Sequence, residues 1–227
     1  MNEIQRKIVE KIKKNHISTT EILDILDKDW EYYINAKPLV SNSYAVGIAH
    51  VVHIIDESNW WIHKDLVDVP EDSIVLVHGH DEERAAFGSL VSKYLLLYKN
   101  VQAIVCHGNL RDGHTLIKEG YPIWCHDLVP VGCFNRHSDR GEEQYKEYKT
   151  WIDEPILVCD DSGIAVITEG HQTEKFLEQL DWIEQQEDIW FDCIDRLKKD
   201  TLWTVCDKKY LEDIEWMKRI GFTGKKP

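Results

Sequence analysis

Two oppositely charged side chains, Arg111 and Asp112, stand next to each other just after a short apolar segment, residues 103–106. That segment has the composition of a buried strand, and the residues after the pair lead into a helix-like stretch, 115–119. In open α/β sheets, ligands bind at the carboxyl ends of strands, where loops and helix N-termini converge. Arg111 could therefore bind a carboxylate or phosphate through its planar guanidinium, and Asp112 could hold a hard divalent cation.

The segments around this pair alternate between strand and helix patterns. Apolar and β-branched runs predict one or two strands over 44–55 and further strands at 73–77, 103–106 and 122–125. Helices are predicted between the later strands, at 87–98 and 115–119, so successive parallel crossovers are expected. Two more apolar runs flank the turn-forming quartet 160–163 and predict a hairpin of strands 156–159 and 164–167.

Helical patterns occupy both ends of the chain. Isoleucine and valine at helical spacing predict a helix over the first 14 residues, and Ser18 and Glu21 have the spacing of a capping box for a second helix. The chain from His171 onward is helical in composition, with a last helix over 208–219. Residues 135–149 show no clear period and are predicted to form a loop or a partly helical excursion. We expect a single α/β domain over 1–227, with helical extensions at 1–16 and 170–227.

Composition narrows the class of partner. The 41 acidic and 27 basic side chains give a net charge of −14, which disfavours nucleic acid and anionic membranes as direct partners. The six cysteines are dispersed and form no C-x-x-C pair, a pattern typical of reduced, buried thiols. No window approaches the length of a membrane span and the N-terminus has no signal core, so a cytoplasmic protein is expected.

Residues 73–133 carry a series of glycines, prolines and charged residues in a set order: Gly88 before a helix, Gly108 with Arg111 and Asp112, then Leu116, Gly120, Pro122, Pro130, Val131 and Gly132. With these positions the stretch resembles the RraA-like family, which contains regulators of ribonuclease E and metal-dependent aldolases of the 4-hydroxy-4-methyl-2-oxoglutarate type. The resemblance implies an α/β fold of the swivelling β/β/α type and a ring-shaped homotrimer with active sites between subunits. The hairpin quartet also fits the family.

The resemblance also implies roles for individual residues. Asp112 would be the direct ligand of Mg²⁺ or Mn²⁺, and Arg111 would hold the substrate near the forming enolate. The backbone amides of Leu90 and Val91 would bind the substrate carboxylate, since helix N-termini favour anions. A glutamate from the C-terminal helix of a neighbouring subunit would complete the site, with Glu187 as the first candidate and Glu184 as the second. The implied site residues are Gly88, Ser89, Leu90, Val91, Arg111, Asp112 and Glu187.

Three departures from the family pattern alter the expected chemistry. Ser89 stands where the aldolases carry an acidic residue, and a serine cannot act as a base near neutral pH. His78 and His107 stand where aspartates are common at strand ends, and with His80, His114 and His126 they could form a different base or add metal ligands. The family's glycine-rich segment before the hairpin is replaced by charged residues. The pocket is therefore expected to differ from that of the known aldolases.

Three functions are compatible with these residues. The leading one is a divalent-metal-dependent lyase, of aldolase or decarboxylase type, that acts on a 2-oxo acid through a pyruvate-like enolate. The alternatives are a related enzyme with a sugar-derived carboxylate as substrate and a non-catalytic regulator that binds a protein. Plain structural roles are also open: an ion pair for Arg111 and Asp112, ordinary hydrogen-bonded histidines, a helix cap for Ser89, and a solvated Glu187.

Overall fold

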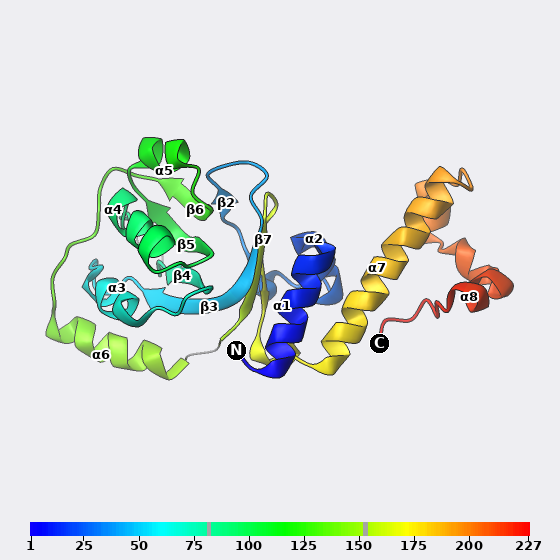
Figure 1. The fold of residues 1–227 in the computed structure, drawn as a ribbon, viewed down its shortest axis with the longest axis horizontal. Coiled ribbons are helices and arrows are strands. Elements are labelled where there is room, and N and C mark those ends of the chain that lie inside the picture. The colour runs from blue at the N-terminus through cyan, green and yellow to red at the C-terminus, as the bar shows by residue number, and fades with distance from the viewer. Residues whose placement is uncertain (81–82, 152–153) are drawn as a thin grey trace.

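The computed structural model describes residues 1–80, 83–151 and 154–227, and shows a mixed α/β fold around a curled, eight-stranded sheet (Figure 1). The strand order is β1-β8-β7-β3-β4-β5-β6-β2. The strands are β1 Tyr33–Ile34, β2 Lys37–Pro38, β3 Ala45–His53, β4 Ile74–His78, β5 Ala103–Leu110, β6 Ile123–Leu128, β7 Ile156–Asp160 and β8 Gly163–Ile167. The α-helices are α1 Glu3–Asn15, α2 Thr19–Ile25, α3 Trp60–Asp65, α4 Ser89–Lys93, α5 Gly113–Glu119, α6 Asp139–Tyr148, α7 Glu174–Asp195 and α8 Ile214–Ile220.

Strand β3 joins two halves of the sheet that differ in direction. Its first part, from Ala45 to Ile48, pairs antiparallel with β7, whereas its second part, from Ala49 to His53, pairs parallel with β4. Strands β4, β5 and β6 continue the parallel half, which confirms the crossovers expected from the alternating sequence pattern. The predicted hairpin is also confirmed as β7 and β8. The carboxyl ends of β3, β4, β5 and β6 consequently meet at one edge.

The sheet curls because its two edge strands are close in sequence. Strands β1 and β2 lie at opposite ends of the strand order, yet Ile34 ends the first and Lys37 begins the second. Inside the curl a core of small and β-branched side chains surrounds the buried Trp124, whose Nε1 donates a hydrogen bond to the carbonyl of Asp160 at 2.8 Å. The edge formed by the carboxyl ends of β3 to β6 therefore has an inner face, which continues this core, and an outer face.

Helices cover both outer surfaces of the sheet (Figure 1). Side chains of α3 and α5, together with the segment that follows α4, pack on the parallel half, while α1, α2 and α7 pack on the antiparallel half. Both N-terminal helices begin with a capping box, as the spacing of Ser18 and Glu21 predicts for α2. Beyond α4 the chain continues as a π-helical turn, Tyr94–Tyr98, so the helix predicted over 87–98 forms from Ser89 onward.

The charged segment 135–149 is helical over most of its length. Ser138 caps α6 by accepting a hydrogen bond from the Gly141 amide at 3.0 Å. Tyr145 fixes the helix to the body, because its ring stacks on Trp61 and its hydroxyl donates to Asp65 at 2.6 Å. A few aromatic anchors on an otherwise polar helix leave little hydrophobic period in the sequence.

The prediction of one continuous last helix over 208–219 is wrong. A 3₁₀ turn, Lys209–Glu212, is followed by a separate helix α8 that ends at Gly221. The break falls at Asp213, whose backbone is not helical and whose carboxylate accepts a hydrogen bond from the Trp216 amide at 2.9 Å. An aspartate that caps a new helix therefore interrupts the helical composition.

All six cysteines fall within the described residues, and each is a free thiol, as the dispersed pattern predicts. Cys106, Cys125, Cys159 and Cys193 are buried, while Cys206 is exposed. Burial raises the pKa of the Cys125 thiol to about 12, which keeps it protonated. Within the parts of the chain that the structure describes, we found no helix long and apolar enough to cross a membrane.

Candidate active site

Asp112 lies directly beyond the carboxyl end of β5, with its side chain held by Ser89. The strand predicted over 103–106 extends to Leu110, so Arg111 and Asp112 occupy the turn between β5 and α5. One carboxylate oxygen of Asp112, Oδ2, accepts hydrogen bonds from the backbone amide of Ser89 at 2.9 Å and from its hydroxyl at 3.0 Å. The hydrogen bond from the Ser89 amide contributes most to holding the pKa of Asp112 below its ordinary value, and the hydrogen bond from the Ser89 hydroxyl and the nearby charge of Arg111 add to it. The carboxylate is therefore ionised at neutral pH.

Ser89 does not cap its helix. Gly88 is the N-cap of α4 and Ser89 is the first helical residue, with its side chain turned to Asp112. The helix-cap interpretation of Ser89 is thus wrong, because the hydroxyl donates to a carboxylate across the loop. Ser89 orients the carboxylate that the sequence predicts as a metal ligand, while it cannot serve as a base.

The loop before α4, residues 85–88, is fixed between β5 and the chain at 131–133. The amide of Ala85 donates to the carbonyl of Val131 at 2.8 Å, and the amide of Ala86 donates to the carbonyl of Asn109 at 2.9 Å. Arg111 closes the arrangement, since its amide donates to the carbonyl of Phe87 at 3.0 Å. A rigid backbone therefore carries Gly88 against Asp112.

Arg111 and Asp112 do not form the structural ion pair considered above. Within the described part of the chain, the Arg111 guanidinium makes no ion pair, and its charge acts on Asp112 only as a weaker, longer-range influence. The guanidinium lies over Gly132, where an added Cβ would stand 2.6 Å from Nη1. Both side chains are exposed at the sheet edge. A cationic group and an anionic group are thus available to an incoming ligand.

The donor set around Asp112 fits a hard divalent cation that is held by one carboxylate. Among the described residues, no cluster of three or more histidine, cysteine, aspartate or glutamate side chains could enclose a metal. Mg²⁺ commonly binds through one or two carboxylates and keeps several waters or substrate oxygens, so a dedicated cage is not required. Asp112 suits such a site because it is ionised, exposed and held in one orientation.

A row of four histidines crosses the same edge of the sheet. His53, His78 and His107 are direct register partners on β3, β4 and β5, and His126 on β6 lies beside His107. Neighbouring rings along this histidine row stand 5.6, 5.4 and 4.8 Å apart between centroids. Each ring follows core residues of the inner face at a spacing of two, so all four project from the inner rim of the curl.

The histidine row opens onto a cavity of about 400 Å³. We call this space the histidine cavity; its lining residues are His78, His80, Glu83, His107, Gly108, Asn109 and His126. The sequence predicts a role for His78 and His107, with His80 and His126 as further candidates. All four histidines line this cavity. His114 is not among the lining residues and lies exposed on α5. His53, Glu83 and Asn109 were missed, although His53 ends its strand as His78 ends the next.

Burial keeps two of these rings neutral. Burial, assisted by neighbouring imidazoles, lowers the pKa of His53 to about 3 and that of His78 to about 4. A histidine in the unfolded chain has a pKa of about 6.5. As the pH falls below that value, these two histidines bind protons in the unfolded chain but stay unprotonated in the native protein. Native stability is therefore present above about pH 6.5 and is lost toward the folded pKa values.

We expect the free energy of unfolding to drop between pH 7 and pH 5 by on the order of 1 kcal/mol for each of these two half-buried rings. Urea unfolding of the wild type and of the double variant His53→Phe/His78→Phe at both pH values measures the effect. The double variant should show a shallower loss of stability. An equal loss in both proteins would mean that other groups titrate instead.

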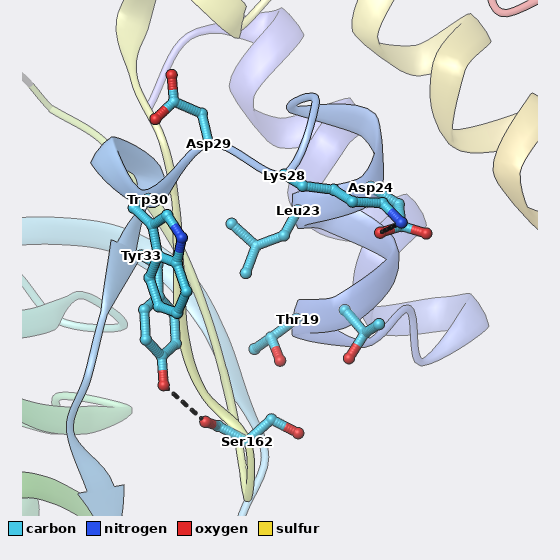
Figure 2. Close-up of a pocket in the computed structure, with 9 residues that line it drawn as sticks. Thr19, Leu23, Asp24, Lys28, Asp29, Trp30, Tyr33 and Ser162 are labelled. Carbon is cyan, nitrogen blue, oxygen red and sulfur yellow. Dashed lines mark hydrogen bonds and ion pairs between the residues drawn. The ribbon is translucent and has the colours of Figure 1, made fainter.

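A second cavity, of about 420 Å³, lies on the other half of the molecule, between α2, the turn at Trp30 and the β7–β8 hairpin (Figure 2). Two pairs of its polar groups are engaged with each other: Lys28 pairs with Asp24 at 3.5 Å, and the Tyr33 hydroxyl donates to the Ser162 carbonyl at 3.1 Å. Trp30 is 80% exposed at its mouth. This arrangement offers less to a polar reaction than the edge that carries Arg111 and Asp112.

Glu187 does not reach Asp112 within one chain. It lies on α7, across the molecule from α4 and α5 (Figure 1). Burial, together with the carboxylates of Glu21, Asp24 and Asp188, raises the pKa of Glu187. The structure therefore brings together Gly88, Ser89, Arg111 and Asp112, with Leu90 and Val91 in the first turn of α4, and places Glu187 elsewhere.

Known proteins are similar to this chain in sequence pattern and in structure. A sequence model of the RraA-like family, described as Aldolase/RraA, matches residues 19–166. An uncharacterized protein from Pseudomonas syringae pv. tomato str. DC3000 has a similar structure (TM-score 0.64, 20% identity, 84% of this chain and 89% of that one). So does Streptomyces coelicolor RraAS2, described as an unusual member of the RNase ES inhibitor RraA family (TM-score 0.64, 17% identity, 85% and 98%). The RNA-processing inhibitor RraA from Thermus thermophilis is less similar (TM-score 0.52, 15% identity, 66% and 92%). No curated protein matches the sequence.

Proposed function

The chain belongs to the RraA-like family, which includes both aldolases and ribonuclease E inhibitors, and on that premise we propose that it is a divalent-metal-dependent lyase acting on a 2-oxo acid. The observation that carries the proposal is the ionised Asp112, held by Ser89 beside an Arg111 whose guanidinium makes no ion pair in the described chain. A protein that only binds another protein has no need to orient a metal-binding carboxylate next to an arginine.

The residues of the site divide the work on the substrate. Arg111 would bind the 2-oxo acid through its planar fork and stabilise negative charge that develops on the oxygen of the 2-oxo group. Together with Arg111, the amides of Leu90 and Val91, in the first turn of α4, would donate hydrogen bonds to the substrate carboxylate because they have no partner within the helix. Asp112 would hold Mg²⁺ or Mn²⁺, which supplies Lewis-acid polarisation of the 2-oxo group when bound.

The reaction this site supports best is loss of a carboxylate from a 2-oxo acid. In oxaloacetate the bond to the leaving CO₂ breaks and its electron pair forms the enolate of pyruvate, which then takes a proton from water, so stabilisation of the enolate is the main requirement. Retro-aldol cleavage needs in addition a base that removes a proton from a hydroxyl, and Ser89 cannot supply one. Decarboxylation therefore makes the smaller demand on these residues.

We expect purified protein to decarboxylate oxaloacetate with Mg²⁺ or Mn²⁺ and to lose that turnover when EDTA is added. Pyruvate formation, followed with a coupled assay, measures the reaction, and metal without protein gives the background rate. Turnover above background that EDTA removes would support the lyase. Activity that EDTA leaves unchanged would contradict the role of the metal, and no activity would favour a binding protein of the ribonuclease-inhibitor kind.

Arg111→Ala is expected to weaken binding of oxalate, a mimic of the enolate, by about 1.5–3 kcal/mol, the range for hydrogen bonds to charged groups. That loss corresponds to roughly 10- to 150-fold in dissociation constant. Isothermal titration calorimetry with Mn²⁺ present measures it. Arg219→Ala, which removes an exposed arginine from α8, is the control and should bind oxalate as the wild type does. Unchanged affinity in Arg111→Ala would remove this residue from the site.

The proposed enzyme assembles as a homo-oligomer, and the family resemblance favours a trimer. In such a ring, Glu187 from a second copy would reach the site that it does not reach in its own chain. A glutamate with a raised pKa suits proton transfer, which Ser89 cannot perform. This role for Glu187 would allow aldol chemistry as well as decarboxylation.

One observation favours a second candidate, a related enzyme with a sugar-derived substrate. The histidine cavity borders the carboxyl ends of the same strands and carries imidazoles rather than the family's aspartates. The imidazoles of this cavity would contact the part of the substrate beyond the reacting 2-oxo group.

A further inference from the structure

We infer that the histidine cavity is a subsite for an uncharged, hydroxyl-bearing portion of the substrate, so that the preferred ligand is a sugar acid whose carboxylate lies at Arg111. The inference rests on the proposed function for the position of the carboxylate. It does not depend on which bond the enzyme breaks.

The lining matches hydroxyl groups because it offers donors and acceptors side by side. A neutral imidazole has one N–H donor and one bare nitrogen acceptor, as a hydroxyl both donates and accepts. Several imidazoles border a single space of about 400 Å³, joined by the Glu83 carboxylate and by the Asn109 side chain, whose Nδ2 already donates to the Glu83 carbonyl at 2.9 Å. Sugar-like chains carry a hydroxyl on nearly every carbon, so they can engage several such groups at once.

The lining does not suit an anionic tail. Among the residues that the structure describes, those that border the histidine cavity include no lysine or arginine, and Glu83 would repel a second carboxylate. Arg84 lines the neighbouring hollow, and its guanidinium already stands 3.7 Å from Glu57 and donates to the Gly132 carbonyl at 3.3 Å. Substrates of the 4-hydroxy-4-methyl-2-oxoglutarate type, which the resemblance implies, carry an additional carboxylate, and the described lining provides no fixed positive charge for it.

The walls of the cavity are braced by aromatic stacking. Tyr148, at the end of α6, stacks on His80 at 4.4 Å and on His53 at 4.9 Å between ring centroids. His53 Nδ1 and His80 Nε2 stand 2.9 Å apart, a hydrogen-bond distance. His80 also adopts a positive φ of 48°, which is uncommon for a residue other than glycine. The rings are thus held in place before a ligand arrives, which reduces the entropy lost on binding.

The histidine cavity continues toward Arg111. A neighbouring hollow of about 850 Å³ shares His80, Glu83 and Asn109 with it and extends along Val131. The next residue, Gly132, lies against the Arg111 guanidinium. His107, Asn109 and Arg111 moreover follow one another along the end of β5, where the register with β6 shifts between Cys106 and Asn109. A carboxylate at Arg111 and a chain of several carbons would span this interval.

The test compares acids that share a carboxylate and a six-carbon chain. Calorimetry with Mn²⁺ present would measure binding of D-gluconate, whose tail carries hydroxyls, hexanoate, whose tail is apolar, and adipate, whose tail is anionic. Oxalate, which has no tail, reports on Arg111 and Asp112 alone. We expect D-gluconate to bind at least tenfold more tightly than hexanoate or adipate.

Two variants locate the effect. His126→Ala removes an exposed ring of the cavity and should weaken D-gluconate at least tenfold while oxalate changes by less than twofold. His114→Ala removes an exposed histidine of α5 that does not line the cavity and should leave both ligands unchanged. Circular dichroism spectra and melting temperatures confirm that both variants are folded.

The outcomes separate this inference from the proposed function. Equal or tighter binding of adipate or hexanoate, or D-gluconate affinity that His126→Ala does not change, would overturn the hydroxyl subsite even where oxalate binds normally. Absence of oxalate binding, with D-gluconate binding that depends on His126, would overturn the proposed site at Arg111 and retain the subsite.

Discussion

Asp112→Asn is expected to lower EDTA-sensitive decarboxylation of oxaloacetate at least about 100-fold and to leave the fold intact. Outer partners of a bound metal typically cost about 10- to 100-fold when removed, and a direct ligand should cost at least as much. Asparagine is the sharpest replacement because the backbone of Asp112 has a φ of 62°, which asparagine tolerates well. Its side-chain oxygen can still accept the hydrogen bonds from Ser89.

The measurement is kcat at saturating Mn²⁺, together with the Mn²⁺ concentration that gives half the maximal rate. Glu119→Gln is the matched control, since it removes an exposed carboxylate from the other end of α5. The control should keep full activity, and both variants should melt within a few degrees of the wild type. Wild-type turnover in Asp112→Asn would remove this carboxylate from the metal site and leave Arg111 as an anion-binding residue only.

The parts of the site that the sequence predicts are those set by short stretches of chain. An apolar strand followed at once by Arg111 and Asp112 places both at a sheet edge, and Gly88 before a helix places a loop nearby. Predictions from local patterns of this kind hold because the residues at a strand end or a helix start largely determine where that element ends or begins. The capping box at Ser18 and Glu21 was predictable for the same reason.

The relations that the sequence could not provide depend on register between distant strands. His53 and His78 are far apart in sequence and become neighbours only because β3 pairs parallel with β4 in one register. A shift by one residue would turn either side chain to the opposite face of the sheet. The role of Ser89 was hidden similarly, since its partner Asp112 comes from another loop. Strand-terminal histidines on successive predicted parallel strands were the available signal, and they identify a row only after the pairing is known.

The second large effect is expected from Gly88→Ala, which should lower oxaloacetate turnover at least about 100-fold through a single added methyl group. A Cβ at this position would overlap Oδ2 of Asp112 and stand 2.8 Å from Cγ of Arg111. The loop cannot retreat easily, because hydrogen bonds from Ala86 and to Phe87 fix it against the end of β5. The carboxylate would therefore be displaced, and misplacement of a reacting group by about 1 Å can cost 10²-fold.

Gly170→Ala is the matched control, because a Cβ added at Gly170 would meet no atom within 4 Å. Both substitutions add the same methyl group, so a loss of turnover confined to Gly88→Ala reports on the site and not on glycine in general. Affinity for Mn²⁺, measured by calorimetry, should fall in the same variant, because the displaced group is the proposed ligand. If Gly88→Ala bound Mn²⁺ and turned over substrate as the wild type does, close contact between this loop and Asp112 would have no part in the reaction. Retained Mn²⁺ binding with lost turnover would instead assign the contact to the position of Arg111, whose Cγ the methyl group also approaches.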